Sequence, residues 1–301
     1  MTLPLNAKAL VLSAMLPLTA LLTGCSEPQS NNSTTTQDIP ATATSAAHPA
    51  QISVQLWSVK DALKNDFKGT LNKLAELGFD GVEFAGDFGP YADDPQGLQD
   101  FLASVGLHAS GAHVPFDKLM NDFDSTVAFY QALGINALII PWHERAFSGD
   151  EVIDFTEDLT MLSDKLAPFG MQVGFHNHAQ EWADYGDGSY FEYIAEHTPQ
   201  SVILQQDVGW TINAGKDPIA FVQAYPGRTL TSHFKSDVPE DSTYLPIIGQ
   251  DNISWSAIYQ ATVTDGGASW IVLEQEVYPN GMTPMQAVAE TKAGFDAIIS
   301  Q

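Results

Sequence analysis

The stretch Leu77–Phe84, LGFDGVEF, contains within eight residues the step from a helix to a strand that decides the fold. Gly78 follows a helical pattern over Thr70–Leu77 and stands where a left-handed C-cap is expected. The short apolar run Gly81–Phe84 begins three residues later and indicates a buried strand. This order of elements predicts one unit of a parallel α/β protein.

The same step recurs along the chain on either side of this stretch. Gly106, Gly134 and Gly170 end further helical patterns directly before apolar runs. The predicted strands are Ile52–Trp57, Gly81–Phe84, Leu107–His113, Ala137–Pro141, Gln172–His176, Val202–Asp207, Leu230–His233 and Trp270–Glu274. The helices expected after them are Thr70–Leu77, Leu98–Val105, Phe123–Leu133, Glu151–Phe169, Tyr190–His197, Ile219–Ala224, Trp255–Thr264 and Met285–Ile299. Eight units without a long interruption favour a single closed (β/α)8 TIM barrel over an open sheet.

The first 24 residues have the composition of a secretory signal peptide. Lys8 precedes the apolar run Ala9–Leu22, which is short and poorly flanked for a membrane span. The run leads into Leu-Thr-Gly-Cys, which resembles a bacterial lipobox and implies a lipid on Cys25, the first residue of the mature chain. An ordinary secretory signal that contains a cysteine is the alternative. Ser26, in place of aspartate, favours an extracytoplasmic anchor at the outer membrane of a Gram-negative bacterium.

Residues 25–50 are rich in Ser, Thr, Asn, Gln, Ala and Pro and cannot bury enough apolar surface to fold, so a disordered tether is expected. Residues 51–301 have the length of one barrel domain. A core of that size needs no disulfide, and the chain contains only one cysteine. The segment Ser236–Ile253 is long for a connection and is expected to cover the top of the barrel.

The charge of the chain excludes some partners. It has 12 Lys and Arg against 37 Asp and Glu, a formal net charge of −25, so nucleic acid is not an expected partner. Arg145 and Arg228 are the only arginines, and no glycine-rich phosphate loop occurs, so a phosphorylated substrate is not supported. The composition does not indicate an oligomeric state, and the membrane is expected to be reached only through the lipid.

Polar residues gather where the predicted strands end. A histidine or carboxylate ends seven of the eight strands, and in a barrel these ends meet at the active-site face. A single histidine at such a place is more often an ordinary hydrogen-bonded loop residue. Like charges that converge on one mouth repel one another, however, and a bound cation relieves the repulsion. The set therefore indicates a metal site.

Six motifs, in their order along the chain, resemble the sugar phosphate isomerase/epimerase family of xylose isomerase-like TIM barrels. The resemblance covers nearly all of the chain from Ile52 on. The family is similar in fold to inosose dehydratase, ketose 3-epimerases and endonuclease IV-type repair enzymes. The motifs are VQLWSVKD (54–61), LGFDGVEFAG (77–86), GFHNHAQEW (174–182), DVGW (207–210), HFKSD (233–237) and VLEQE (272–276).

The resemblance implies one divalent metal held from the ends of the last four barrel strands. The family pattern Glu, Asp, His, Glu falls on His176, Asp207, His233 and Glu274, with histidine in place of the first glutamate. The alternative for His176 is a packing histidine that bonds to Asp207. Two imidazoles and two carboxylates suit Mn, Co, Zn or Fe(II) better than Mg or Ca, which prefer oxygen ligands only.

The candidate proton-transfer groups surround this metal site. In the ketose epimerases both metal-bound glutamates move protons, and here Glu274 remains of that pair, while Glu181 could supply another carboxylate. His178 and His113 are candidates for proton shuttling near neutral pH. The histidine at position 176 removes one carboxylate, which favours elimination or one-base isomerisation over 3-epimerisation.

The remaining candidates concern substrate binding. Lys235 lies two residues after His233, so both side chains point the same way on a strand, and its amine could stabilise an enolate. An ion pair of Lys235 with a neighbouring carboxylate is the alternative. Indole rings pack against sugar C–H faces, although any one of these tryptophans could equally pack at the barrel rim. The expected substrate-binding residues are Glu83, His113, Trp57, Trp142 and Trp210.

These expectations combine into a metal-dependent isomerase/epimerase or lyase. Its substrate would be a sugar, keto-sugar or inositol derivative, and its chemistry proton abstraction next to a carbonyl. The alternative is a non-catalytic, cell-surface carbohydrate-binding lipoprotein, which would keep the tryptophans but would not need the intact ligand set. The acidic charge, the signal peptide and the scarcity of Arg and Lys argue strongly against a repair endonuclease.

Overall fold

The computed structural model describes residues 50–239 and 241–300. The predicted signal peptide, the lipidation site Cys25 and all of the predicted tether except Ala50 lie outside the described residues. In the part that is described, none of the helices is both long enough and apolar enough to span a membrane.

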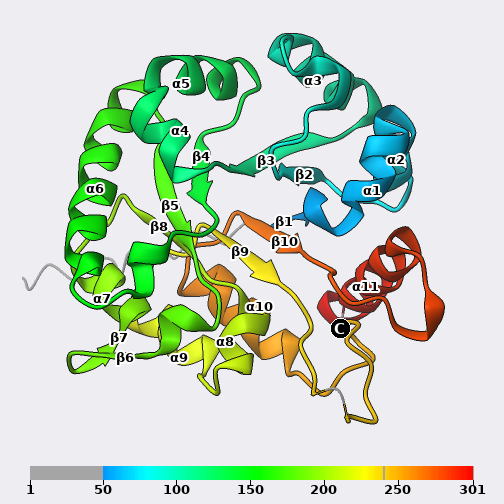
Figure 1. Cartoon of the computed structure of the whole chain (residues 1–301). Coiled ribbons are helices and arrows are strands. Elements are labelled where there is room, and N and C mark those ends of the chain that lie inside the picture. The colour runs from blue at the N-terminus through cyan, green and yellow to red at the C-terminus, as the bar shows by residue number, and fades with distance from the viewer. Residues whose placement is uncertain (1–49, 240, 301) are drawn as a thin grey trace, which may run out of the picture. The chain divides into compact units, whose positions relative to one another are not determined.

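Eight parallel strands form the centre of the domain, in the order β8-β5-β4-β3-β2-β1-β10-β9 (Figure 1). The two ends of this order meet through an isolated parallel bridge between Asp207 and His233, and the N–H of His233 donates to the carbonyl of Gln206 at 2.9 Å. The sheet thus closes into the predicted barrel. The strands are β1 (Gln51–Gln55), β2 (Gly81–Phe84), β3 (His108–His113), β4 (Ala137–Ile140), β5 (Gln172–His176), β8 (Ile203–Gln205), β9 (Thr231–Phe234) and β10 (Trp270–Leu273).

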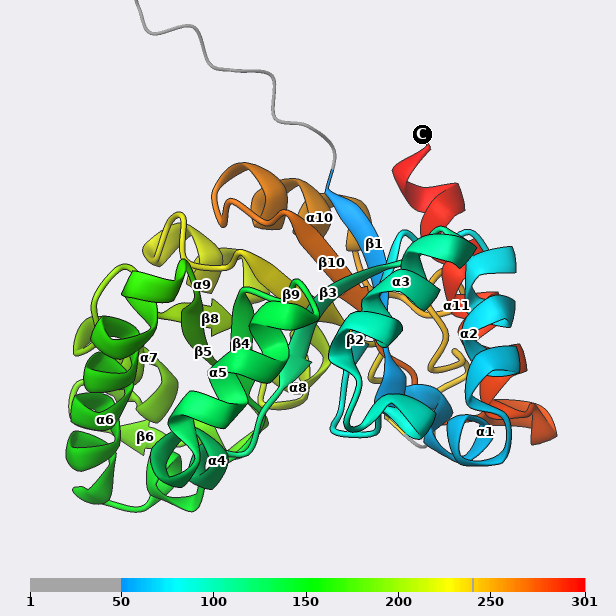
Figure 2. The ribbon, with the colours of Figure 1, turned by 90° about the horizontal axis from the view of Figure 1, so that it is seen from above.

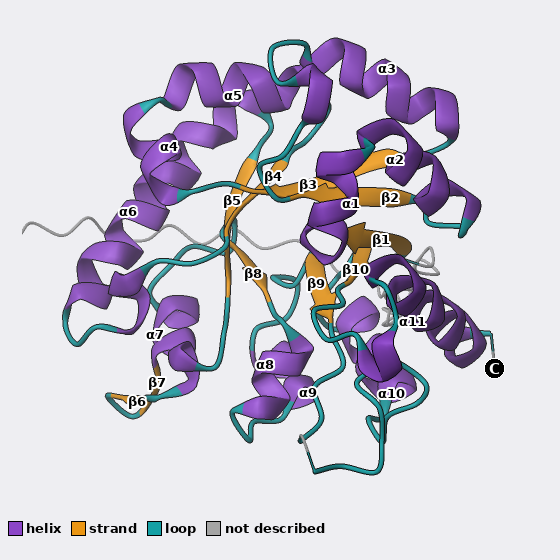
Figure 3. Ribbon diagram, turned by 45° about the vertical axis from the view of Figure 1, so that its right-hand side comes forward, coloured by secondary structure: helices purple, strands orange, loops and turns teal. Residues whose placement is uncertain are grey.

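Helices surround the strands on the outside, as the views in Figures 2 and 3 show. The α-helices are α1 (Lys60–Asn65), α2 (Phe67–Glu76), α3 (Pro95–Val105), α4 (Phe116–Asn121), α5 (Phe123–Ala132), α6 (Glu151–Leu166), α7 (Tyr190–Glu196), α8 (Val208–Asn213), α9 (Pro218–Ala224), α10 (Trp255–Thr264) and α11 (Pro284–Ile299). The short 3-10 helices are η1 (Leu56–Val59), η2 (Gly89–Tyr91), η3 (Glu144–Phe147), η4 (Ala167–Phe169), η5 (Gln180–Trp182) and η6 (Pro279–Gly281).

Alternation along each strand separates two interiors. On β5, Phe175 points outward and packs against Phe155 of α6 with ring centroids 5.2 Å apart. Its neighbour His176 therefore points into the barrel, because successive strand side chains face opposite sides. The large core lies between strands and helices, whereas the inner apolar layer of the barrel is a small cluster of Ala137, Ile139 and Ile203, with Leu230 packed against it.

Glycines make room for the polar layer above this small cluster. A Cβ on Gly174 would lie 2.5 Å from Cδ1 of Ile139 and 2.9 Å from the carbonyl oxygen of Ile203. A Cβ on Gly111 would lie 3.2 Å from Oε2 of Glu83. The barrel interior is therefore packed so closely that a side chain at Gly174 would clash with its neighbours, and one at Gly111 would fit only if Glu83 shifted.

The predicted fold class is confirmed, and the differences are local. The structure adds a hairpin of β6 (Asp184–Tyr185) and β7 (Gly188–Ser189), and the short helices α1, α4 and α8. Two-residue strands and six-residue helices have too few residues to show a period. The segment Ser236–Ile253 packs at the end of β10, where the carbonyl of Pro246 accepts from Nε2 of Gln275 at 2.8 Å.

Candidate functional site

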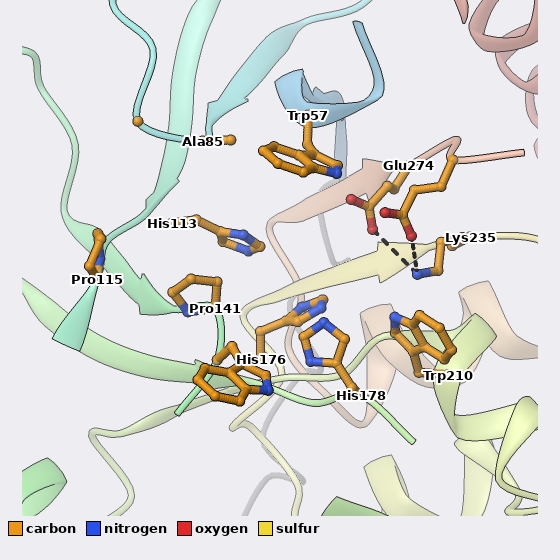
Figure 4. Close-up of a pocket in the computed structure, with 13 residues that line it drawn as sticks. Trp57, Ala85, His113, Pro115, Pro141, His176, His178, Trp210, Lys235 and Glu274 are labelled. Atoms are coloured by element: carbon orange, nitrogen blue, oxygen red, sulfur yellow. Dashed lines mark hydrogen bonds and ion pairs between the residues drawn. The ribbon is translucent and has the colours of Figure 1, made fainter. Parts of the chain in front are cut away.

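The carboxyl ends of the strands surround a cavity of about 410 Å³, which we name the central cavity. Three tryptophans line it, Trp57 from η1, Trp142 from the loop after β4 and Trp210 from α8, and the side chains of Trp57 and Trp142 are 45% and 49% exposed. Figure 4 shows Trp57 and Trp210 on the wall, with histidines between them. The polar residues that line it are His113, His176, His178, Lys235, Glu274 and Glu276.

Asp207, His233 and Glu274 meet at the carboxyl ends of β8, β9 and β10. Their potential ligand atoms all lie within 4.8 Å of one another. Nδ1 of His233 is 3.1 Å from Oε2 of Glu274 and 4.0 Å from Oδ2 of Asp207. Oδ2 of Asp207 is buried and accepts no hydrogen bond from the described residues. The ammonium of Lys235 is 3.5 Å from this oxygen. A buried oxygen without a hydrogen-bond donor is costly, so the three residues fit a further cation at this place.

Glu83 lies behind His233 and orients its ring. Its Oε1 is 2.5 Å from Nε2 of His233 and also accepts from Nε2 of Gln55 at 2.7 Å. A metal-ligating histidine commonly gives its other N–H to a carboxylate in this way, which leaves Nδ1 of His233 for the ion. Burial lowers the pKa of His233, but Glu83 and Glu274 raise it to about 10, so the ring is itself a cation when no metal replaces the proton.

Gln205 connects the polar side chains inside the barrel. Its Nε2 donates to Oε2 of Glu83 at 2.7 Å, and burial of that carboxylate is outweighed by facing imidazoles, which lower the pKa of Glu83. An ionised carboxylate only accepts, so the amide nitrogen of Gln205 must face it. Oε1 of Gln205 therefore accepts N–H bonds from Nε2 of His113 at 2.9 Å and from Nδ1 of His176 at 3.2 Å.

This arrangement fixes the tautomer of His176. Burial holds the pKa of His176 well below its ordinary value, so the ring is neutral. Because Nδ1 carries the proton, Nε2 carries the lone pair and faces Oδ2 of Asp207 at 4.0 Å. Two electron-rich atoms facing each other across this distance fit a bridging cation better than a histidine–aspartate hydrogen bond. His176 also belongs to a second group of potential ligands, with His113 and His233.

Lys235 brings an ammonium group to the same place. Its Nζ is 2.8 Å from Oε2 of Glu276, 3.5 Å from Oδ2 of Asp207 and 3.8 Å from Oε2 of Glu274. The ammonium also lies 4.1 Å from the ring centre of Trp210. Burial alone would lower the pKa of Lys235, but the carboxylates raise it. The amine is therefore charged, borders the central cavity and also makes the ion pairs that were its alternative role.

The charges of this cluster do not balance without a further cation. Burial would raise the pKa of Glu274, yet Lys235 and His233 lower it to about 2. Burial raises the pKa of Asp207 to about 6, below neutrality. Without a metal, four carboxylates thus oppose one ammonium and one imidazolium, which leaves two negative charges. A divalent ion that takes the place of the Nδ1 proton of His233 would reduce this excess to one negative charge. The groups counted are Glu83, Asp207, Glu274, Glu276, Lys235 and His233.

His178 and Glu181 differ in their access to the central cavity. His178 lines it, and burial followed by the charge of Lys235 lowers its pKa to about 4, so the imidazole is neutral at pH 7. Glu181 is fully buried, and its Oε2 accepts the backbone N–H of His178 at 2.8 Å. Burial raises the pKa of Glu181 to about 7. Glu181 therefore supports the loop after β5, and the structure does not place it against a substrate.

The other predicted site residues either lie buried beneath the central cavity or line its wall. Glu83, expected to bind substrate, is completely buried and contacts His233 rather than the central cavity. Asp207 and His233 are also buried beneath the cavity, as metal ligands would be. The residues that both the sequence prediction and the cavity wall share are Trp57, Trp142, Trp210, His113, His176, His178, Lys235 and Glu274.

The sequence prediction gave no role at the site to its neutral amides. Gln205 and Gln55 are buried strand-end residues of β8 and β1, and the Oδ1 of Asn177 accepts the backbone N–H of Asp207 at 3.0 Å. Glu276, the last residue of the VLEQE motif, was likewise not assigned to the site. The alternation that placed Glu83 and His233 inside the barrel would have placed the two glutamines there as well.

No protein-family model matches the chain. Among curated proteins, the inosose dehydratase of Lacticaseibacillus casei is 23% identical over 280 residues, which cover 78% of this chain and 90% of that protein. Among solved structures, a sugar phosphate isomerase/epimerase from Parabacteroides distasonis superposes with a TM-score of 0.68 at 22% identity, covering 87% of this chain and 100% of that one.

A third similar protein was solved with a metal. The IOLI protein with a zinc atom superposes with a TM-score of 0.62 at 16% identity, over 83% of this chain and 98% of that one. Similarities at these identities show the fold. The chain thus has the xylose isomerase-like barrel fold that its motifs predicted.

Proposed function

We propose that this protein is a metal-dependent enzyme that acts on a sugar, keto-sugar or inositol derivative by removing a proton next to a carbonyl. The observation that carries the proposal is the buried Oδ2 of Asp207, which accepts no hydrogen bond from the described residues and faces the lone pair of His176 at the base of a tryptophan-lined cavity. Relatives named inosose dehydratase and sugar phosphate isomerase/epimerase support the same class of substrate.

His176, Asp207, His233 and Glu274 would hold the ion. Two imidazole and two carboxylate ligands favour Mn, Co, Zn or Fe(II) over Mg. When bound, such an ion supplies Lewis-acid polarisation of a substrate carbonyl or hydroxyl pair. Glu83, Gln205 and Asn177 then act as positioning residues, because each holds a ligand residue without reaching the central cavity.

Of the two carboxylates expected as the base, the geometry favours Glu274, since it lines the central cavity and Glu181 does not. Glu274 takes the proton from the carbon beside the carbonyl, and the released electron pair moves to the carbonyl oxygen. The N–H donors of Lys235 hold the resulting enolate oxygen. The neutral imidazole of His178 can accept a proton from, or return one to, the substrate.

The distribution of carboxylates favours elimination or one-base isomerisation over a symmetric 3-epimerisation. Glu274 and Glu276 are the carboxylates that line the central cavity, and both come from the end of β10. A two-glutamate mechanism requires one carboxylate on each face of the substrate. Among the described residues, the wall of the central cavity does not offer this arrangement. In an elimination, the enolate expels the oxygen substituent on the next carbon, which leaves with its electron pair and is protonated.

Metal content tests the first half of the proposal. The purified wild type should hold about one equivalent of a divalent transition metal by elemental analysis, because a four-residue shell binds tightly. The double variant Asp207→Ala, His233→Ala should lose it, whereas the exposed pair Asp124→Ala, His108→Ala should retain it. One equivalent retained in the Asp207 and His233 variant would refute the metal site.

Proton exchange tests the second half. The protein would be incubated in deuterated water with 3-keto-glycosides, ketohexoses and inososes, and the signals beside the carbonyl followed by proton NMR. Exchange should occur with at least one candidate and fall by about 100-fold or more in Glu274→Gln, on the scale of a lost acid–base group. The exposed Glu157→Gln is the control. A loaded protein that binds these sugars without any exchange would support the carbohydrate-binding alternative instead.

A further inference from the structure

A second hollow of about 460 Å³ adjoins the central cavity, and we name it the side cavity. It shares Trp57, Ala85 and Gly86 with the central cavity, so the two hollows adjoin along a rim formed by these residues. Figure 4 shows Trp57 and Ala85 on the same side of the central cavity. Both hollows have the volume of a small-molecule site.

The rim between them is low. Gly86 has φ +87°, a conformation that disfavours every other residue type, and no heavy atom lies within 4 Å of the position its Cβ would occupy. Ala85 contributes only a methyl group. Of the three shared residues only Trp57 has a large side chain, so the rim is low at Ala85 and Gly86, where a ligand could cross from one hollow into the other.

The central cavity does not extend further into the barrel. The buried layer of Glu83, His233 and Gln205 closes the barrel beneath it, and Gly111 and Gly174 bring the backbone close below that layer. A ligand longer than one ring therefore extends toward the open mouth or over the rim rather than deeper into the barrel. The side cavity adjoins this rim, and the exposed indole of Trp57 forms part of its wall.

The walls of the side cavity suit a carbohydrate ring. Leu56 and Leu63 form an apolar, buried floor, and Asp87 adds a carboxylate. The ammonium of Lys60 lies 3.6 Å from the ring centre of Trp57, which holds it at the edge of the hollow. Lys60 makes no ion pair with the described residues, so its N–H donors remain for ligand hydroxyls. An apolar face with donors and an acceptor at its edge matches the C–H faces and hydroxyls of a sugar.

We propose that the side cavity binds a second sugar ring, so that the substrate is a two-ring carbohydrate whose reacting ring occupies the central cavity. The assignment of the reacting ring rests on the proposed function, whereas the second subsite rests on the side cavity itself. The charged side chains of the side cavity are Lys60, Lys64 and Asp87, with Asp61 3.7 Å from Lys64, so a neutral ring fits their balance.

Binding measurements on the full chain test the subsite without requiring turnover. Isothermal titration calorimetry would compare glucose with cellobiose and maltose, as one-ring and two-ring probes. At least one disaccharide should bind about tenfold or more tightly than glucose, equivalent to about 1.4 kcal/mol. Lys64→Trp, at an exposed wall position, should fill the side cavity and abolish this gain while glucose binding is unchanged. Lys73→Trp, at an exposed position on α2 away from both cavities, should keep the gain.

Each result decides the proposal. If neither disaccharide binds more tightly than glucose, or if the gain survives in Lys64→Trp, the second subsite is refuted. Failure of the proposed function has a different signature, because it would abolish proton exchange with every keto-sugar while leaving the disaccharide gain in place. Conversely, exchange that persists with a one-ring keto-sugar, together with equal binding of both probe classes, would refute the subsite alone.

Discussion

Gln205 determines the protonation pattern of its neighbours through one amide group. Its nitrogen is held by the ionised Glu83, and its oxygen accepts from His113 and His176. The lone pair of His176 is thereby directed to the side on which Asp207 lies. A neutral amide with no contact to the cavity thus decides whether a histidine can act as a ligand.

We predict that Gln205→Met weakens metal binding by about 10–100-fold, the usual effect of removing a residue that orients a ligand. Nitrogen NMR of the metal-free protein should show that His176 loses its preference for the Nδ1–H tautomer. The exposed Gln200→Met is the matched control. A variant that retains both the tautomer and the metal affinity would show that Gln205 only fills space.

Glu181 leads to a prediction about stability and pH. Burial raises its pKa to about 7, above the ordinary 4.5, so the folded state binds more protons than the unfolded state between these values. Stability therefore falls as pH rises through this window, by roughly 3 kcal/mol in total. Glu181→Gln carries no charge, and its free energy of unfolding relative to wild type should rise from pH 4.5 to 7 and then level.

Urea unfolding at a series of pH values measures this difference, with the exposed Glu157→Gln as the control. If the free energy of unfolding of Glu181→Gln depends on pH in the same way as that of the control, burial does not raise the pKa of Glu181. The same result would return Glu181 to the list of candidate bases, since its carboxylate would then be hydrated.

The sequence predicted which residues belong to the site wherever a strand end could be recognised. It did not predict what each of these residues does there. Glu83 and His233 are 150 positions apart and 2.5 Å apart in space, a contact that exists only because the barrel closes. No local pattern reports such a distance. The sequence therefore predicted that Glu83 binds substrate, because its contact with His233 could not be foreseen. The glutamines received no role because a neutral amide within a strand pattern does not by itself indicate a functional site.

At the scale of elements, α8 is coupled to the site through its first residue. Asp207 is the N-cap of α8, and its Oδ1 accepts the N–H of Trp210 at 2.8 Å. The cap fixes the carboxylate and leaves Oδ2 directed to the cluster. A six-residue helix is too short to be predicted from a period, yet DVGW contains its cap. The motif therefore carried information about an element as well as about a ligand.

Gly174 allows β5 to lie close to the side chains of its neighbouring strands β4 and β8. Gly174→Ala would force Cβ to within 2.5 Å of Ile139 and 2.8 Å of Ile203, so β4, β5 and β8 must separate. Overpacking of this kind should destabilise the protein by about 1–3 kcal/mol. Metal affinity should fall as well, because His176 lies two residues further along the same strand.

Urea unfolding and metal titration measure the two effects. The second substitution Ile139→Val removes the nearest clashing methyl group and should recover part of the lost stability, whereas Ile153→Val, on the exposed side of α6, should recover none. Full stability of Gly174→Ala alone would show that the barrel interior has free space above Ile139.

The whole molecule combines a strongly acidic chain with a site that concentrates negative charge further. The eight-unit barrel was predictable because each strand and helix has its own local pattern and glycines mark the boundaries. The 3-10 helices, the hairpin and the side cavity arise from how loops pack on one another, which local patterns do not record. The net charge of −25 adds to the repulsion at the cluster, so the bound ion should also stabilise the fold.

A lipid on Cys25 would anchor the mature protein to a membrane. Cys25 is the only cysteine, it follows an apolar run and small residues, and the polar segment after it suits a tether rather than a folded element. We predict that cells given radioactive palmitate label the wild type and Ser26→Ala but not Cys25→Ala. Metal content should be unchanged in Cys25→Ala, because all four expected ligands lie between residues 176 and 274. Equal labelling of wild type and Cys25→Ala would show that no lipid is attached there and would leave an ordinary secretory signal as the explanation.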